Sequence, residues 1–264
     1  MDLLKKTIEK AITKGELVTK LKELGVKDKM VLETHIALSS FGYVIGGAQA
    51  VVNALIETIG YEGTLVMPLQ DANNCDPTIW ETPAIDHELH QIVRDNTPAF
   101  DKKESDGVDM GVIVENFRRR DGAIVSNNPS LAYVARGKYA KLICDRHPLH
   151  FSLGEDSPIS RLYDLDAYVL LIGVPFSKCT CLHLAEYRSG YRPIVIQGAA
   201  VEIKGKRIWK KYLDIDLNST IFNEIGLAME NQVDMKRLLI NDAQLRLFSV
   251  KEAIDFAVDY LKQK

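Results

Sequence analysis

Apolar residues recur along the chain at two spacings, one typical of amphipathic helices and the other of buried strands. The helical spacing predicts helices over 2–13, 16–24, 48–59, 111–120, 180–188, 219–230 and from Ser249 to the C-terminus. Apolar runs predict strands over 30–34, 64–67 and 168–174, and two alternating runs predict a hairpin over 201–212. Local signals fix several ends: Gly25 and Gly60 end helices, Pro68 ends the second strand, and Ser249 and Glu252 have capping-box spacing.

The order of these elements indicates the fold class. The strand over 30–34 leads through a turn containing Gly and Ser into the helix over 48–59, and a second strand follows. This strand–helix–strand order predicts a βαβ unit and therefore an α/β fold. The uninterrupted apolar run 168–174 predicts a strand that is buried on both faces. No repeat, low-complexity tract or linker interrupts the chain, so we expect residues 1–264 to form one integrated domain.

Composition and overall charge narrow the functional classes. The 264 residues are 46% hydrophobic and 26% charged, with a formal net charge of −3, which excludes disordered and fibrous classes. The near-neutral total argues against a nucleic-acid partner, and no apolar segment is as long as a membrane span. The N-terminal segment mixes charges into a helical pattern, unlike a secretory signal, and four cysteines do not make a disulfide framework. We therefore expect a cytoplasmic protein with no membrane partner.

The charges are distributed unevenly. Between Lys29 and Arg94 lie 64 residues without a Lys or Arg, and this window holds eight of the acidic residues. Burial explains the missing charges around 44–55, because charged side chains are rare in buried strands and helices. Burial does not explain the five acids between Asp71 and Glu88, which lie in a polar, Pro-containing loop. This loop indicates an electronegative surface for a cationic ligand, and an ordinary solvated loop is the alternative.

The segment CTCLHLAEYR, at 179–188, carries the clearest candidate chemistry. His183 and Glu186 are three residues apart, so both lie on one face of the predicted helix. A carboxylate beside an imidazole fixes its tautomer and raises its basicity, as a general base requires. A surface pair without function has the same spacing. With Cys179 and Cys181 the pair also suggests a zinc site, and Cys181 a nucleophile, although buried structural cysteines explain the thiols more simply.

Two turns and one basic run suggest anion binding. The segment Ser39-Ser40-Phe41-Gly42 with Gly46-Gly47 precedes a helix, and backbone N–H groups at such a start bind phosphates. The segment 153–158 is a second turn before a helix, in which Ser157 serves equally well as an N-cap followed by a proline. Arg118, Arg119 and Arg120 end a helix and suit either a phosphate or a solvated helix end.

Together these segments resemble the aminoglycoside 3-N-acetyltransferase family over nearly the whole chain. The matching stretches are LSSFGYVIGGAQAVVNALIETIGYEGTLVMP, DPTIW, MGVIVENFRRR, HPLHFSLGEDSPISRLYDLDAYVLLIGV and TCLHLAEYR, in the family's order. The resemblance implies a single α/β domain with a central mixed β-sheet flanked by helices, distinct from the common acetyltransferase fold. It also implies transfer of an acetyl group from acetyl-CoA to the 3-amino group of a 2-deoxystreptamine aminoglycoside or similar polyamine, without a metal.

The resemblance further implies roles for individual residues. His183 is expected to be the general base that deprotonates the attacking amine, Glu186 to orient it or contact the amine, and Thr180 to stabilise the thioester oxyanion. Asp71 and Asp76 are expected to bind the cationic substrate. The residues expected to bind acetyl-CoA are His35, Ala37, Leu38, Ser39, Ser40, Val44, Gly46 and Ser157. The protein is expected to be a monomer or a homodimer.

Several positions depart from the family pattern. The usual HSSLSS reads HIALSS at 35–40, the usual TPT reads SDG at 105–107, the usual SNHP reads SNNP at 126–129, and a Gly-containing loop reads PFSKC at 175–179. These changes leave the expected fold intact, but each lost hydrogen bond to CoA costs about 0.5–1.5 kcal/mol. A diverged member that binds CoA or a cationic ligand without aminoglycoside turnover is therefore the alternative hypothesis.

Overall fold

The computed structural model describes residues 10–80, 84–105 and 110–264. In these residues, seven strands form one central mixed sheet in the order β10-β11-β7-β2-β4-β6-β5. The strands are β2 (Val31–Ile36), β4 (Thr64–Gln70), β5 (Ile124–Val125), β6 (Leu131–Gly137), β7 (Tyr168–Ile172), β10 (Lys236–Ile240) and β11 (Ala243–Ser249). The three central strands β7, β2 and β4 are parallel, and antiparallel strands extend the sheet at both edges. The predicted α/β fold with a central mixed sheet is confirmed.

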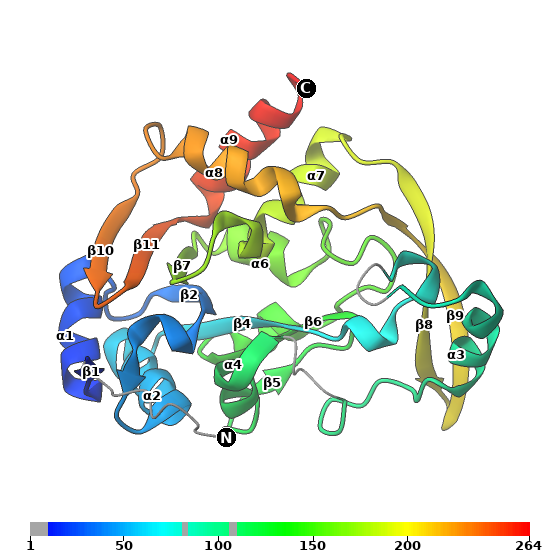
Figure 1. Ribbon diagram of the computed structural model, residues 1–264, viewed down its shortest axis with the longest axis horizontal. Helices are drawn as coiled ribbons and strands as arrows, with labels where there is room; N and C mark the ends of the chain where they lie inside the picture. Colours follow the sequence, from blue (N-terminus) through cyan, green and yellow to red (C-terminus); the bar gives the residue numbers. More distant parts are fainter. Residues whose placement is uncertain (1–9, 81–83, 106–109) are drawn as a thin grey trace, which may run out of the picture.

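Helices cover both faces of this sheet (Figure 1). One face packs against α1 (Lys14–Leu24), α2 (Gly47–Ile59) and α4 (Gly111–Arg118). The other packs against α5 (Ala140–Cys144), α6 (Pro158–Asp164), α7 (His183–Ser189), α8 (Phe222–Met229) and α9 (Val250–Leu261). Alternation along β2 explains the two layers, because Leu32 joins the first hydrophobic cluster and Val31 joins the second.

A long hairpin lies to one side of the sheet, with α3 (His90–Asn96) beside it (Figure 1). Its strands are β8 (Ile194–Ile203) and β9 (Lys206–Ile215), which pair along their whole length. Lys204 and Gly205 form the two-residue turn, and both have positive φ angles (52° and 72°), as this turn requires. The predicted hairpin is confirmed and extends beyond 201–212. The end of β9 brings acidic residues back toward the carboxyl ends of the central strands.

Local sequence signals explain several element boundaries. Thr13 and Glu16 form a capping box at the start of α1, and Gly25 ends that helix in the left-handed conformation at φ 109°. Ser249 accepts a hydrogen bond from the backbone N–H of Glu252 at the start of α9. The predicted βαβ unit is β2–α2–β4, in which the two strands pair in parallel from Val31 with Thr64. The caps and helix ends depend on residues close together in the sequence, whereas the pairing of β2 with β4 joins residues that are far apart in it.

Three predicted boundaries need correction. The helix predicted over 2–13 lies mostly outside the described residues, and Ala11–Ile12 form a strand, β1, that pairs with β3 (Tyr43–Val44). Pro68 does not end its strand, because β4 continues to Gln70. The pairing of β4 with β2 stops at Val66, and beyond that residue β4 pairs, among the described strands, only with β6. The missing N–H of the proline therefore removes no hydrogen bond to β2. The helix predicted over 111–120 ends at Arg118. In the described residues no helix is long and apolar enough to cross a bilayer.

Candidate active site

His183 is the first residue of α7, and a short 3-10 helix, Thr180–Leu182, connects it to the segment after β7. Its Nδ1 lies 2.5 Å from Oε2 of Glu186, one turn along the same helix. The side chain of Glu186 is 0% exposed and that of His183 is 11% exposed. Because a carboxylate only accepts hydrogen bonds, Nδ1 donates to Glu186, and in the neutral ring the lone pair lies on Nε2. The ring therefore exposes an acceptor nitrogen while its other side is fixed.

Contacts from other segments hold Glu186 in turn. Its Oε1 accepts a hydrogen bond from the backbone N–H of Asn218 at 3.4 Å and lies 3.9 Å from Nε of Arg192. Arg192 also forms an ion pair with Asp216. The ring of Phe222 packs edge-on against the imidazole, with 4.8 Å between ring centroids. The predicted His–Glu pair exists, and its buried carboxylate is placed to orient the imidazole rather than to meet a ligand.

His183 borders a cavity of about 420 Å³, here called the central cavity, at the carboxyl ends of β2 and β7. The connection after β2 leads to α2 on one face of the sheet, and the connection after β7 leads to α7 on the other face. The two connections therefore leave neighbouring strands in opposite directions. In α/β sheets ligands bind at such a switch point. Thr180, His35 and Ala37 line the same cavity, so the structure brings four of the predicted site residues together.

A second hollow of about 540 Å³ adjoins the central cavity, and Ala37 and Ile113 line both. We call it the β2–α2 hollow, because it follows the connection between those two elements. Its lining includes the predicted residues Ala37, Leu38, Ser39 and Val44. The Ser40 hydroxyl instead donates to the Ala37 carbonyl at 2.6 Å.

The other two predicted CoA residues occupy helix starts. Gly46 is the N-cap of α2 and makes no side-chain cap. Ser157 lies elsewhere, fully buried, where its hydroxyl caps the start of α6.

An acidic cleft of about 690 Å³ also adjoins the central cavity, sharing Gln70 and Ser219 with it. Asp71 lines this cleft, and so do Asp214 at the end of β9 and Asp216 just after it. Trp80 and Tyr212 contribute aromatic surface. Sequence reasoning missed Asp214 and Asp216, although their spacing of two residues at the end of an alternating run places both on one face.

Asp76 does not line the acidic cleft. Its carboxylate forms an ion pair with Arg94 at 2.8 Å and accepts hydrogen bonds from Thr78. Burial favours the neutral acid, but the hydrogen bonds from Arg94 and Thr78 outweigh it and lower the pKa of Asp76. Asp76 therefore stabilises the loop that carries Asp71. Glu81, another acid of the predicted electronegative window, lies outside the described residues.

The cysteines offer neither a thiolate nor a metal site. Cys179 and Cys181 are fully buried, with 3.4 Å between their sulfur atoms. The hydrogen bond to Cys179, burial and the charge of Glu33 all raise the pKa of Cys181, which keeps it a thiol. Within the described ranges, no three His, Cys, Asp or Glu side chains are arranged to hold a metal ion. The described residues therefore lend no support to the zinc site or to Cys181 as a nucleophile.

The predicted basic run binds its own helix. Arg118 and Arg119 contact Glu115, and Arg120 donates to the side chain of Asn116.

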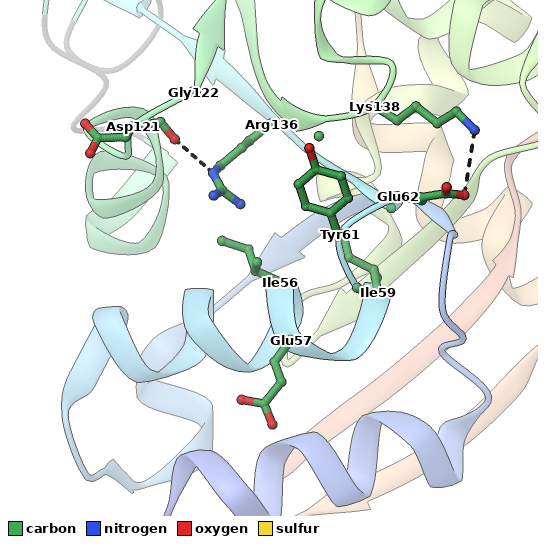
Figure 2. A pocket seen from close by; sticks show the side chains of 12 residues that line it. Ile56, Glu57, Ile59, Tyr61, Glu62, Asp121, Gly122, Arg136 and Lys138 are labelled. Carbon is green, nitrogen blue, oxygen red and sulfur yellow. Dashed lines mark hydrogen bonds and ion pairs between the residues drawn. The ribbon is translucent and has the colours of Figure 1, made fainter.

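A further hollow of about 660 Å³ lies where α2 ends and β4 begins (Figure 2). There Arg136 donates to the backbone carbonyl of Asp121, and Lys138 lies 3.8 Å from Glu62. Neither place contains any of the predicted site residues.

Comparisons with known proteins agree with this arrangement. A profile of the family described as aminoglycoside 3-N-acetyltransferase matches residues 34–262. The SPbeta prophage-derived aminoglycoside N(3')-acetyltransferase-like protein YokD of Bacillus subtilis is 43% identical over 246 residues, 93% of this chain and 90% of YokD. Aminoglycoside N(3)-acetyltransferase VIII of Streptomyces fradiae is 35% identical over 283 residues, 98% of this chain and 96% of that enzyme.

Solved structures show the same fold. The crystal structure of YokD from Bacillus subtilis has a TM-score of 0.92 at 42% identity, and the match covers 96% of this chain and 94% of that one. The binary complex of AAC-IIIb with CoASH has a TM-score of 0.84 at 25% identity, covering 96% and 97%. These neighbours confirm that the α/β fold is distinct from the common acetyltransferase fold.

Proposed function

The chain belongs to the aminoglycoside 3-N-acetyltransferase family, and from this premise we propose that it transfers an acetyl group from acetyl-CoA to the 3-amino group of a 2-deoxystreptamine aminoglycoside or similar polyamine. One observation carries the proposal. His183, held by Glu186, borders a cavity that shares lining residues with an apolar hollow and, at other positions, with an acidic cleft. A thioester and a cationic amine can thus reach one imidazole from two separate binding surfaces.

The β2–α2 hollow suits acetyl-CoA, which supplies the activated acetyl group. Val44 and Ile113 provide apolar wall, and Ser39 provides a hydroxyl. The start of α2 has no side-chain cap, so its N–H groups and the positive end of its helix dipole are available to phosphate oxygens. We assign Ser157 to holding α6 in place, because its hydroxyl already caps that helix.

The acidic cleft suits the amine substrate. Asp71 and Asp216 offer carboxylates to ammonium groups, and Asp216 also forms an ion pair with Arg192. Asp214 is buried and accepts hydrogen bonds from Tyr187 and Ser152. Trp80 and Tyr212 offer faces for the sugar rings and for cations. The amine attacks in its neutral form, and its nitrogen loses a proton as the new N–C bond forms. His183 accepts that proton at Nε2, while Glu186 stabilises the imidazolium that forms.

Thr180 completes the site on the thioester side. It lines the central cavity together with His183 and is the first residue of the 3-10 helix that precedes α7. We assign its hydroxyl to the carbonyl oxygen of the thioester, where negative charge develops as the amine attacks. Since the three cavities take residues from both helical layers and from the hairpin, we propose that the chain works as one integrated domain.

The test is a thiol-release assay with acetyl-CoA and a panel of aminoglycosides, with mass spectrometry to locate the acetyl group. We expect product modified at the 3-amino group. The diverged-member hypothesis predicts calorimetric binding of CoA, or of the cationic ligand, with no acetylated product from any amine tested. An intact His183–Glu186 pair favours turnover, because a protein that only binds does not need an oriented base.

A further inference from the structure

A buried carboxylate lies beneath the central cavity and has no part in the mechanism above. Glu33 is on β2, and its side chain is 0% exposed. Its Oε1 accepts a hydrogen bond from the Tyr133 hydroxyl at 3.2 Å, and its Oε2 has no hydrogen-bond partner in the part of the chain that the structure describes. No Lys or Arg among the described residues forms an ion pair with it. A charged carboxylate buried with only neutral donors, the Tyr133 hydroxyl and the Cys181 thiol, is strongly destabilising.

His35 is the group that offsets this charge. It is two residues further along β2, on the same face, and its Nε2 lies 3.4 Å from Oε1 of Glu33. The His35 side chain is 4% exposed, and Nε2 has no other partner in the described ranges. A bare anion or a bare cation at this depth is costly, and a single proton shared between the two side chains leaves the pair without net charge.

This pair borders the reacting centre. His35 lines the central cavity with His183 and Thr180. Two imidazoles, each beside a fully buried carboxylate, therefore line one cavity, His35 from β2 and His183 from the start of α7.

We propose that the Glu33–His35 pair is the general acid of the reaction and protonates the sulfur of the departing CoA; this inference rests on the proposed function. The new N–C bond forms as the C–S bond breaks, and the electron pair of that bond leaves on sulfur. His183 holds the proton from the amine. The Nε2 of His35 is buried against Glu33, so the other ring nitrogen, Nδ1, supplies the proton that turns the thiolate into a thiol. The two imidazoles then exchange a proton with water, which restores both starting states.

The other titratable groups around the pair do not compete for this role. Burial and the neighbouring charge of Glu33 raise the pKa of Tyr133 on β6, so its proton stays bound. The hydrogen bond to Cys179, burial and Glu33 likewise raise the pKa of Cys181. Cys179 is fully buried, and His183 is already assigned to the amine. His35 is the member of this group that reaches the cavity.

The kinetic test uses His35→Gln, which keeps a donor toward Glu33 but has no proton to transfer. We expect kcat to fall about 10²-fold or more while KM for acetyl-CoA stays within about threefold. In Glu33→Gln the loss should be greater near pH 8 than near pH 6, because the charge that retains the proton is gone. Tyr133→Phe, which keeps both members of the pair, is the matched control and should lose far less. An increase in KM with unchanged kcat would mean that His35 only binds CoA, and the proposal would be overturned.

A second measurement needs no substrate and is independent of the proposed function. Carbon-13 shifts of the histidine rings report the protonated fraction of His35, whose signals are assigned by their loss in His35→Gln. We expect this fraction, at a fixed pH near 7, to fall clearly in Glu33→Gln, with thermal unfolding showing that the variant is folded. If the protonated fraction of His35 is unchanged in Glu33→Gln, the proposal that the two side chains share a proton is overturned, even when the enzyme is active. If instead the fraction falls but no amine is acetylated, the pair stands and the proposed function fails.

Discussion

The β2–α2 hollow and the acidic cleft meet at the central cavity, but they are built differently. The hollow takes its lining from 36–47 and 111–113, and much of it is apolar side chain and backbone. The cleft takes its lining from segments as far apart as Gln70 and Thr220, and it contains three carboxylates. The first surface depends on local turn geometry, and the second on a hairpin that folds back across the molecule. We therefore expect substitutions to affect the two substrates separately, except at the imidazole between them.

The largest effect is expected where the two sides meet. His183→Ala removes the base that both substrates need, so kcat should fall about 10²- to 10⁴-fold in the thiol-release assay. Glu186→Gln should lose activity as well, because the imidazole loses the partner that fixes its tautomer. His87→Ala, at an exposed position on the surface, is the matched control. Turnover of His183→Ala equal to that of the unmodified protein would refute the role of His183.

A smaller effect, confined to one substrate, is expected in the acidic cleft. Asp71→Asn removes a charge but keeps the side-chain oxygen that caps the backbone N–H of Asn73. Losing one charge-assisted hydrogen bond of about 1.5–3 kcal/mol should raise KM for the aminoglycoside about 10- to 100-fold and leave KM for acetyl-CoA unchanged. The Asp76→Asn control should instead lower the melting temperature, because it breaks the ion pair with Arg94. Equal changes in both KM values would contradict the division into two sides.

The same comparison shows what the sequence could predict. The turn 39–47 and the pair at 183–186 depend on neighbouring residues, so their spacing made them candidates, and the family resemblance supplied their expected roles. Asp214 and Asp216 were missed because only the pairing of β8 with β9 brings them to the cleft. Glu33 was counted with the acids of an electronegative window, yet its strand buries it completely. The prediction that Pro68 ends its strand was wrong. The pairing of β4 with β2 stops at Val66, so no backbone N–H is needed on that side at Pro68.

The stability of the segment that holds Asp214 beside the acidic cleft should also depend on pH. His147 is buried, its Nε2 lies 2.7 Å from the Ser152 carbonyl, and the backbone N–H of Ser152 donates to Asp214. Burial lowers the pKa of His147 from 6.5 to about 4. Between these two pKa values the unfolded chain binds a proton at His147 and the folded chain does not. The contribution of neutral His147 to the free energy of unfolding is therefore complete above pH 6.5 and is lost as pH falls toward 4.

Between pH 7 and pH 5.5 this linkage should lower the free energy of unfolding by about 1 kcal/mol, measured by urea unfolding. His147→Gln keeps a donor for the Ser152 carbonyl and cannot titrate, so its stability should change less over the same range. A pH slope identical in both proteins would show that His147 does not carry the effect. The β2–α2 hollow contains no comparable buried histidine in its described lining, so CoA binding should not follow this change.

The smallest effect is expected from two neighbouring serines on the side of the hollow. Ser39 is exposed and lines the hollow, whereas the Ser40 hydroxyl is bound to the Ala37 carbonyl. Ser39→Ala should raise KM for acetyl-CoA about threefold, equivalent to one neutral hydrogen bond of about 0.6 kcal/mol, without changing the melting temperature. Ser40→Ala should lower the melting temperature instead, because it releases the carbonyl that holds the turn. The two substitutions differ because the Ser40 hydroxyl is hydrogen-bonded within the protein, whereas the Ser39 hydroxyl faces the hollow. If Ser40→Ala raised KM for acetyl-CoA and Ser39→Ala did not, the CoA contact would be assigned to Ser40 instead.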